Sequence, residues 1–174
     1  MSSCCGSNCN CKDNSNISLK KKIEIDFLYL DLSVCERCQC ADTNLDEAIN
    51  EVSSVLKSAG YEISVNKVNI ISKELAEKYE FISSPTIRIN GNDITMEVNE
   101  TPCKECGDLC GDEVECRVWI YEGVEYQEPP KAMIINAILK HVYSGNKEVK
   151  IEKKKYELPK NLELFFNGLN GKKS

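Results

Sequence analysis

Three cysteines fall within the six-residue segment 35–40, which reads Cys-Glu-Arg-Cys-Gln-Cys. Cys35 and Cys38 form a Cys-x-x-Cys pair, in which one thiolate can attack a disulfide and the second thiol can resolve the mixed disulfide. With Cys40, the segment offers three sulfur ligands for copper(I), zinc(II) or the three-sulfur pyramid of arsenic(III). The spacing therefore indicates redox chemistry, soft-ion binding, or small side chains that are simply buried.

A second group of four cysteines lies in the segment 103–116. Gly107 and Gly111 permit the tight turns that a tetrahedral site needs, and the spacing fits neither common ferredoxin pattern, so we expect structural zinc. One or two disulfides, or free thiols in a surface loop, are the alternatives. The predicted zinc ligands are Cys103, Cys106, Cys110 and Cys116.

The cysteine count limits how these thiols can be used. The 174 residues include 11 cysteines, an odd number that cannot all pair, and one histidine, His141, which we expect to be structural. Clustered cysteines in a reducing compartment are more often metal ligands or redox groups than disulfides. Four more cysteines lie in residues 1–16, a polar segment that we expect to be flexible and that either captures a soft ion or has no assigned task.

Charge and hydropathy exclude several classes of protein. The net charge of −6 makes a broad nucleic-acid-binding surface unexpected, and no apolar run approaches the roughly 20 residues of a membrane span. The first fifteen residues have no apolar stretch like that of a secretory signal. We therefore expect a cytoplasmic protein that binds neither nucleic acid nor membrane.

Hydrophobic periodicity predicts alternating strands and helices. A strand is predicted near residues 22–30, a helix over 45–59 and a strand over 61–70, followed by a short helix over 72–79. Two such units in succession imply parallel strands. Thr43 and Asp46 resemble a capping box, which would start the first helix after the cysteines.

The second half of the sequence predicts a hairpin, an insertion and two helices. Pro85 opens a strand that ends in the turn Asn90-Gly91, with a return strand over 93–98. A β-rich stretch over 117–126 precedes a helix that runs from the prolines to about residue 143, and Pro159 starts a short amphipathic helix. The predicted organisation is a tail (1–16), one domain (17–144) with a cysteine-rich insertion (101–116), and a C-terminal extension (145–174).

The Cys-x-x-Cys pair after the first strand and Ser84-Pro85-Thr86 before the third resemble the thioredoxin superfamily over residues 23–143, apart from the insertion. The resemblance implies an α/β fold with a central mixed four-stranded or slightly larger sheet flanked by helices. It also implies a cis peptide before Pro85, and backbone at Ser84 and Thr86 that pairs with a substrate chain. An uncharacterised bacterial thioredoxin-like family with an extra cysteine-rich segment is also similar, and implies no established function.

Three departures separate this sequence from active thioredoxins. Glu36 and Arg37 replace the glycine, proline or aromatic residues common between the two cysteines, and Tyr29 stands where those proteins have a carboxylate. A helix that starts only after the cysteines would also give Cys35 less help from the helix dipole.

The leading hypothesis from the sequence is a thiol-disulfide oxidoreductase that needs no cofactor for its redox chemistry. Cys35 attacks a protein or small-molecule disulfide, Cys38 resolves the product, and Pro85 presents the backbone. The alternative is a thiolate protein for zinc, copper(I) or arsenic(III), which uses the second group or the trio Cys35, Cys38 and Cys40. A domain that kept the fold and lost the chemistry is the third reading.

Overall fold

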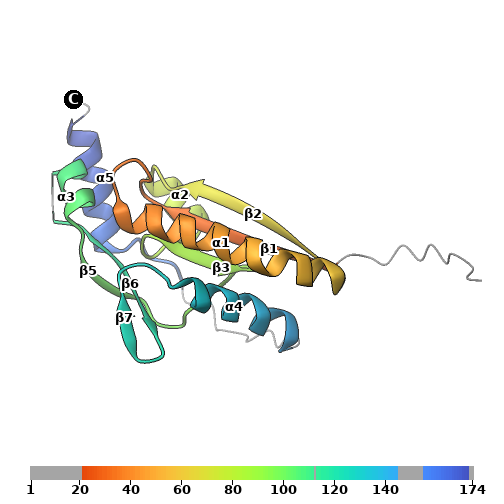
Figure 1. Cartoon of the computed structure of the whole chain (residues 1–174). Coiled ribbons are helices and arrows are strands. Elements are labelled where there is room, and N and C mark those ends of the chain that lie inside the picture. Colours follow the sequence, from red (N-terminus) through yellow and green to blue (C-terminus); the bar gives the residue numbers. More distant parts are fainter. Residues whose placement is uncertain (1–20, 112, 145–154, 173–174) are drawn as a thin grey trace, which may run out of the picture.

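The computed structural model describes residues 21–111, 113–144 and 155–172. These residues form five helices and seven strands, arranged in two sheets (Figure 1). The N-terminal segment predicted to be flexible, 1–16, lies outside the described residues together with its four cysteines. Within the described ranges, no helix is long and apolar enough to cross a membrane.

The larger sheet has four strands in the order β2-β1-β3-β4. The central strand β1 (Lys21–Tyr29) runs parallel to β2 (Tyr61–Asn69) and antiparallel to β3 (Thr86–Ile89). β4 (Asn92–Asp93) pairs antiparallel with β3 at the edge. The predicted α/β class with a mixed four-stranded sheet is confirmed.

The turn between β3 and β4 is the predicted Asn-Gly hairpin. Asn90 and Gly91 both have positive φ, 48° and 79°, as a tight hairpin turn requires. The return strand is shorter than the predicted range 93–98, because only β4 pairs with β3. Asp93 instead turns the chain, accepting hydrogen bonds from the backbone and hydroxyl of Thr95.

Helices cover both faces of this sheet (Figure 1). α1 (Glu36–Ser58) and α4 (Lys131–Tyr143) pack side by side on one face, and the short α2 (Lys73–Lys78) lies on the other. The predicted helices are therefore present, and α4 follows the prolines as expected.

The prediction that the first helix starts after the cysteines is wrong. α1 begins at Glu36 with Cys35 as its N-cap residue, so the whole segment 36–40 is helical. Thr43 lies inside the helix and donates its hydroxyl to the carbonyl of Gln39, one turn back. This intrahelical bond satisfies threonine without a capping box.

The cysteine-rich segment forms a second unit rather than a loop. β5 (Asn99–Pro102), β6 (Glu115–Tyr121) and β7 (Val124–Tyr126) make a three-stranded antiparallel sheet. Between β5 and β6 the chain forms α3 (Lys104–Cys110), against which the C-terminal α5 (Lys160–Lys172) packs. The helix predicted after Pro159 is thus present and docked.

Two clusters of buried side chains hold these layers together. The apolar core lies between the main sheet and the pair α1 and α4, and includes Ile25, Phe27, Leu45 and Ile134. The cysteine core lies at the end of the molecule where α3 and α5 meet the sheet, and combines carbon side chains such as Phe165 with six cysteines. Alternation along β1 sends Phe27 into the first cluster and Leu28 into the second.

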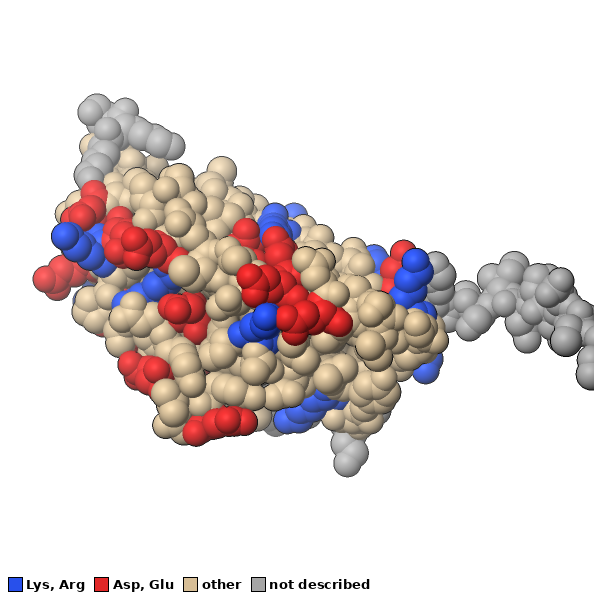
Figure 2. Space-filling view, in the orientation of Figure 1, with Lys and Arg blue, Asp and Glu red and all other residues tan. Residues whose placement is uncertain are grey.

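Charged side chains of both signs cover the face that carries α1. Figure 2 shows acidic groups gathered over α1 and over the end that holds α3, with basic groups between them. Lys131 of α4 forms ion pairs with Glu47 and Glu51 of α1. No wide basic patch interrupts the face that this view presents.

Candidate functional site

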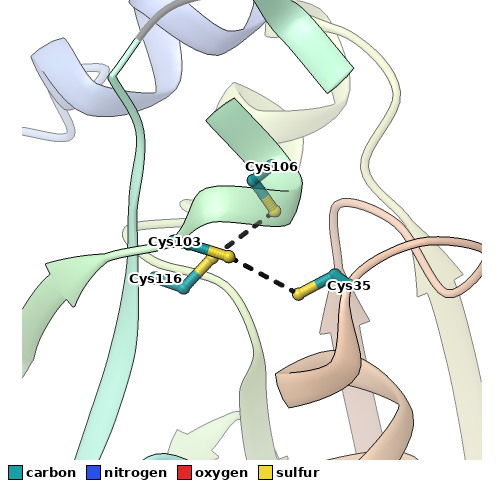
Figure 3. Close-up of side chains that lie close together, drawn as sticks. All are labelled: Cys35, Cys103, Cys106 and Cys116. Atoms are coloured by element: carbon teal, nitrogen blue, oxygen red, sulfur yellow. Dashed lines mark hydrogen bonds between the residues drawn. The ribbon is translucent and has the colours of Figure 1, made fainter. Parts of the chain in front are cut away.

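Four buried thiols converge at the junction of the two sheets (Figure 3). Their Sγ atoms all lie within 4.8 Å of one another, and no other such group of histidine, cysteine or acidic side chains occurs among residues 21–111, 113–144 and 155–172. We call them the four-thiol group: Cys35, Cys103, Cys106 and Cys116.

Each thiol is held by the end or interior of a regular element. Cys35 and Cys103 are the N-cap residues of α1 and α3, Cys106 lies in the first turn of α3, and Cys116 belongs to β6. Cys103 is fixed further by its backbone N–H, which donates to the carbonyl of Val114. The group therefore connects α1, which packs on the main sheet, to α3 and β6 of the second unit.

The sulfur spacing matches the coordination shell of one ion. Four thiolates placed tetrahedrally at a zinc–sulfur distance of about 2.3 Å stand about 3.8 Å apart. The Sγ atoms of Cys35 and Cys103 are 3.9 Å apart, and those of Cys106 and Cys116 are 3.5 Å apart. These four cysteines could therefore hold a metal.

The thiols perturb one another strongly. The pKa of Cys35 lies far below its ordinary value because neighbouring thiols stabilise its thiolate, Cys103 most strongly and Cys38 among them. The pKa of Cys103 is also lowered, mainly by Cys106 and Cys116. The pKa of Cys106 is raised by its interaction with Cys103, and that of Cys116 by Cys103 and Cys106, with burial contributing to both. Cys35 and Cys103 are thus favoured as thiolates, while Cys106 and Cys116 keep their protons. A divalent ion would displace those protons on binding.

Comparison with protein families gives a match to a family model over residues 23–138, two thirds of the chain. The chain belongs to the DUF2703 family. That family is described as a domain of unknown function, and its match includes the four-thiol group but ends before α5. No curated protein and no solved structure matches the chain.

Within the DUF2703 region, Cys110 stands apart from the thiols predicted to join it. It lies one helical turn beyond Cys106, a rise of about 6 Å along α3. There it is buried, with its Sγ 3.8 Å from the carbonyl of Gly107. The structure therefore groups Cys103, Cys106 and Cys116 with Cys35, and not with Cys110.

The trio Cys35, Cys38 and Cys40 is not brought together either. Cys38 is fully buried, and its Sγ lies 3.3 Å from the hydroxyl of Ser84. Cys40 is exposed, because residues two apart on a helix do not share a face. Burial and nearby Glu128 raise the pKa of the Cys40 thiol.

The predicted substrate-binding residues, Ser84 and Thr86, form hydrogen bonds with other parts of this chain. The peptide between Ser84 and Pro85 is cis, and the carbonyl of Ser84 accepts a hydrogen bond of 2.7 Å from the backbone N–H of Arg117 in β6. Thr86 is buried, donates to the carbonyl of Ser83 and accepts from the guanidinium of Arg117. In this DUF2703 domain, β6 therefore occupies the position beside Pro85 that the resemblance assigned to a substrate chain.

Arg37 is the residue at this site that sequence reasoning missed. It lies between Cys35 and Cys38 in the sequence, its side chain is buried, and its guanidinium donates to the carbonyls of Thr101, Pro102 and Cys116 and to the hydroxyl of Thr101. It therefore links α1 to the two strands that flank the four-thiol group. An arginine between two cysteines was a visible signal, but the sequence did not show which strands it would meet.

Proposed function

We propose that this chain binds one soft metal ion, zinc(II) by preference, through the thiolates of the four-thiol group. The observation that carries the proposal is the convergence of four buried Sγ atoms within 4.8 Å of one another, with two of the separations, 3.9 and 3.5 Å, close to those on a tetrahedral ion. All four positions are taken by protein sulfur, which is the pattern of a structural site rather than a catalytic one with an open position. The ion would join the main sheet to the cysteine-rich unit.

The donor set favours zinc over the other candidates from the sequence. Four sulfurs in a tetrahedron suit zinc(II) or a single iron, whereas arsenic(III) uses three sulfurs and leaves its lone pair free. An iron–sulfur cluster binds its cysteines to different iron atoms, so their sulfurs stand farther apart than sulfurs on one ion. A maximum separation of 4.8 Å among all four Sγ atoms supports a mononuclear site.

We further propose that the chain has a thioredoxin-like fold. The strand order β2-β1-β3-β4, with β1 parallel to β2 and antiparallel to β3, supports this assignment. So do the Cys-x-x-Cys pair at the start of α1 and the cis peptide before Pro85. The cysteine-rich unit is then an addition to that fold.

The thiol-disulfide oxidoreductase hypothesis has one favourable observation and two that weigh against it. Cys35 is the N-cap of α1, where the helix dipole favours a thiolate. However, Cys35 has no exposed surface for a protein disulfide to reach. The carbonyl of Ser84, which a substrate backbone would use, is already bonded to Arg117. We therefore prefer the metal site.

Elemental analysis of the full chain tests this proposal. Wild-type protein purified without chelator should hold about one zinc per chain. Cys35→Ser should lose most of that zinc, because it removes the ligand that α1 supplies. Cys110→Ser is the matched control, since Cys110 is also buried but lies outside the group, and it should retain the wild-type content. Equal zinc in wild type and Cys35→Ser, or none in the wild type, would overturn the proposal.

A further inference from the structure

Cys38 is a buried thiol beside the four-thiol group but outside it. Cys35 is the N-cap of α1 and Cys38 lies in the first turn, three residues later, where the two thiols interact and shift each other's pKa. Cys38 is fully buried, so its neighbours are fixed by packing rather than by solvent. The group therefore contains one cysteine, Cys35, that has a second possible partner on its own helix.

The hydroxyl of Ser84 lies beside the sulfur of Cys38. The hydroxyl oxygen of Ser84 accepts a hydrogen bond of 3.0 Å from the backbone N–H of Leu30. That bond leaves the Ser84 hydroxyl a lone pair and its hydrogen for the Sγ of Cys38, 3.3 Å away, so either atom can donate. The interaction with Cys35 and burial raise the pKa of Cys38 and outweigh the opposite effect of Ser84, so Cys38 is held as a thiol beside Cys35.

We infer that Cys38 makes the metal site sensitive to oxidation: a peroxide converts Cys35 and Cys38 into a disulfide, and the ion leaves. This inference rests on the proposed function, because it concerns the release of the ion that the four-thiol group binds. Loss of Cys35 leaves the ion three ligands, all from the segment 103–116. An incomplete shell opens a coordination position to water and chelators.

The reaction balances with hydrogen peroxide as the only oxidant. The Cys35 thiolate attacks one peroxide oxygen, so a sulfur–oxygen bond forms, the oxygen–oxygen bond breaks, and the departing hydroxide takes a proton from solvent to become water. The Cys38 thiol then attacks the sulfur of the resulting sulfenic acid. A sulfur–sulfur bond forms, the sulfur–oxygen bond breaks, and the second hydroxide takes the Cys38 proton and leaves as water. Two electrons pass from the two sulfur atoms to the peroxide.

Burial selects this class of oxidant. A protein disulfide cannot approach Cys35, which has no exposed surface, whereas hydrogen peroxide is small and uncharged. Cys103 competes with Cys38 for the oxidised sulfur, because its Sγ lies 3.9 Å from that of Cys35. A Cys103 thiolate that binds the ion is not free to attack, whereas Cys38 lies outside the four-thiol group, so ligation favours Cys38.

The experiment follows zinc release and disulfide formation together. Full-length protein is first loaded with zinc(II), freed of excess metal and analysed, then treated with hydrogen peroxide in the presence of a chromogenic chelator. Mass spectrometry of alkylated peptides identifies the disulfide. We expect wild type to release its zinc with a Cys35–Cys38 disulfide, and a dithiol reductant to restore binding.

Two variants separate this inference from the proposed function. Cys38→Ser should bind zinc as the wild type does but release it about tenfold more slowly under peroxide, because the neighbouring resolving thiol is gone. Cys38→Ala gives the same comparison without a hydroxyl, and Cys110→Ser should behave as wild type. Release from the Cys38 variants at the wild-type rate, or a wild-type disulfide between Cys35 and Cys103, would overturn the inference and leave the zinc site standing. Absence of zinc in the loaded wild type would overturn both.

Discussion

The apolar core and the cysteine core lie in one small molecule but are built from different kinds of side chain. None of the fourteen buried residues of the apolar core is a cysteine, whereas six of the fifteen in the cysteine core are. Carbon side chains such as Phe27 and Leu45 gain stability from burial alone. Buried thiols contribute stability that changes when they lose a proton, are oxidised or bind an ion. The stability of the apolar core therefore depends on which side chains it buries, whereas that of the cysteine core depends also on the chemical state of its thiols.

The physical reason for the difference is the size of the second unit. The segment between β5 and β6 contains a seven-residue helix, too short to be stable by its own hydrogen bonds. Its buried side chains are largely cysteines, which supply less apolar area than leucine or phenylalanine. Under the proposed function, an ion that joins the four sulfurs would compensate for that small apolar contribution together with the docked helix α5.

Removing the ion should produce the largest difference between the two cores. With free zinc about a thousandfold above its Kd, binding stabilises the folded chain by about 4 kcal/mol, which a chelator would abolish. Hydrogen exchange should then accelerate in α3, β6 and the first turn of α1, while β1 retains its protection. The apolar core needs no ion, so its exchange should change least.

Restoring zinc after chelation is the control for this experiment, and it should recover the slow exchange of α3. Equal acceleration in both cores would show that the ion is not local to the cysteine core. No acceleration in either would show that the thiols pack adequately without it.

Replacing Arg37 should weaken the connection between the two units by a smaller amount. Arg37→Gln removes charge-assisted hydrogen bonds to the carbonyls of Thr101, Pro102 and Cys116, at a cost of about 2 kcal/mol in the free energy of unfolding. Because those carbonyls flank two of the grouped cysteines, zinc affinity should also fall about tenfold. Unfolding in denaturant and competition with a chelator measure the two effects.

Arg88→Gln is the matched control, since Arg88 also donates to backbone carbonyls, those of Tyr79 and Glu80, but these belong to neither of the strands that flank the four-thiol group. It should lower stability without changing zinc affinity. If both arginine variants changed zinc affinity equally, Arg37 would have no special role in positioning the site.

Much of the fold could be predicted because its signals are local. The Asn90-Gly91 turn, the prolines before α4 and the apolar face of the last helix each act within a few residues, and the structure contains all three elements. The start of α1 could not be predicted, because the Thr43 hydroxyl can form a hydrogen bond either as a helix cap or, as here, with a carbonyl one turn back inside the helix. Local sequence does not distinguish these two uses.

The site was harder to predict because it is assembled from distant parts of the sequence. Three of the four grouped thiols come from the cysteine-rich segment, but Cys35 lies 68 residues before Cys103. Cysteine spacing also suggested Cys110, because a spacing alone does not show that α3 continues for another turn and carries that thiol away. The docking of α1 against β5 and β6, which decides the fourth member, is a tertiary event.

The smallest expected effect concerns the contact between α5 and α3. A Cβ atom at Gly168 would clash with the carbonyl oxygen of Cys110, which is backbone and cannot move without shifting α3. Gly168→Ala should therefore lower the free energy of unfolding by about 1 kcal/mol, the cost of overpacking less the gain in helix propensity. Gly171→Ala should give only the stabilising gain in helix propensity, because its added Cβ would meet nothing within 4 Å.

The two alanine variants also show whether α5 protects the cysteine core. If it does, Gly168→Ala should expose α5 to limited proteolysis and speed the transfer of zinc to a chelator, while Gly171→Ala changes neither. The apolar core should be indifferent to both substitutions, because α5 contributes no buried residue to it. Equal zinc transfer from the two variants would mean that the cysteine core is closed by its four thiols alone, and that α5 only covers a site that is already complete.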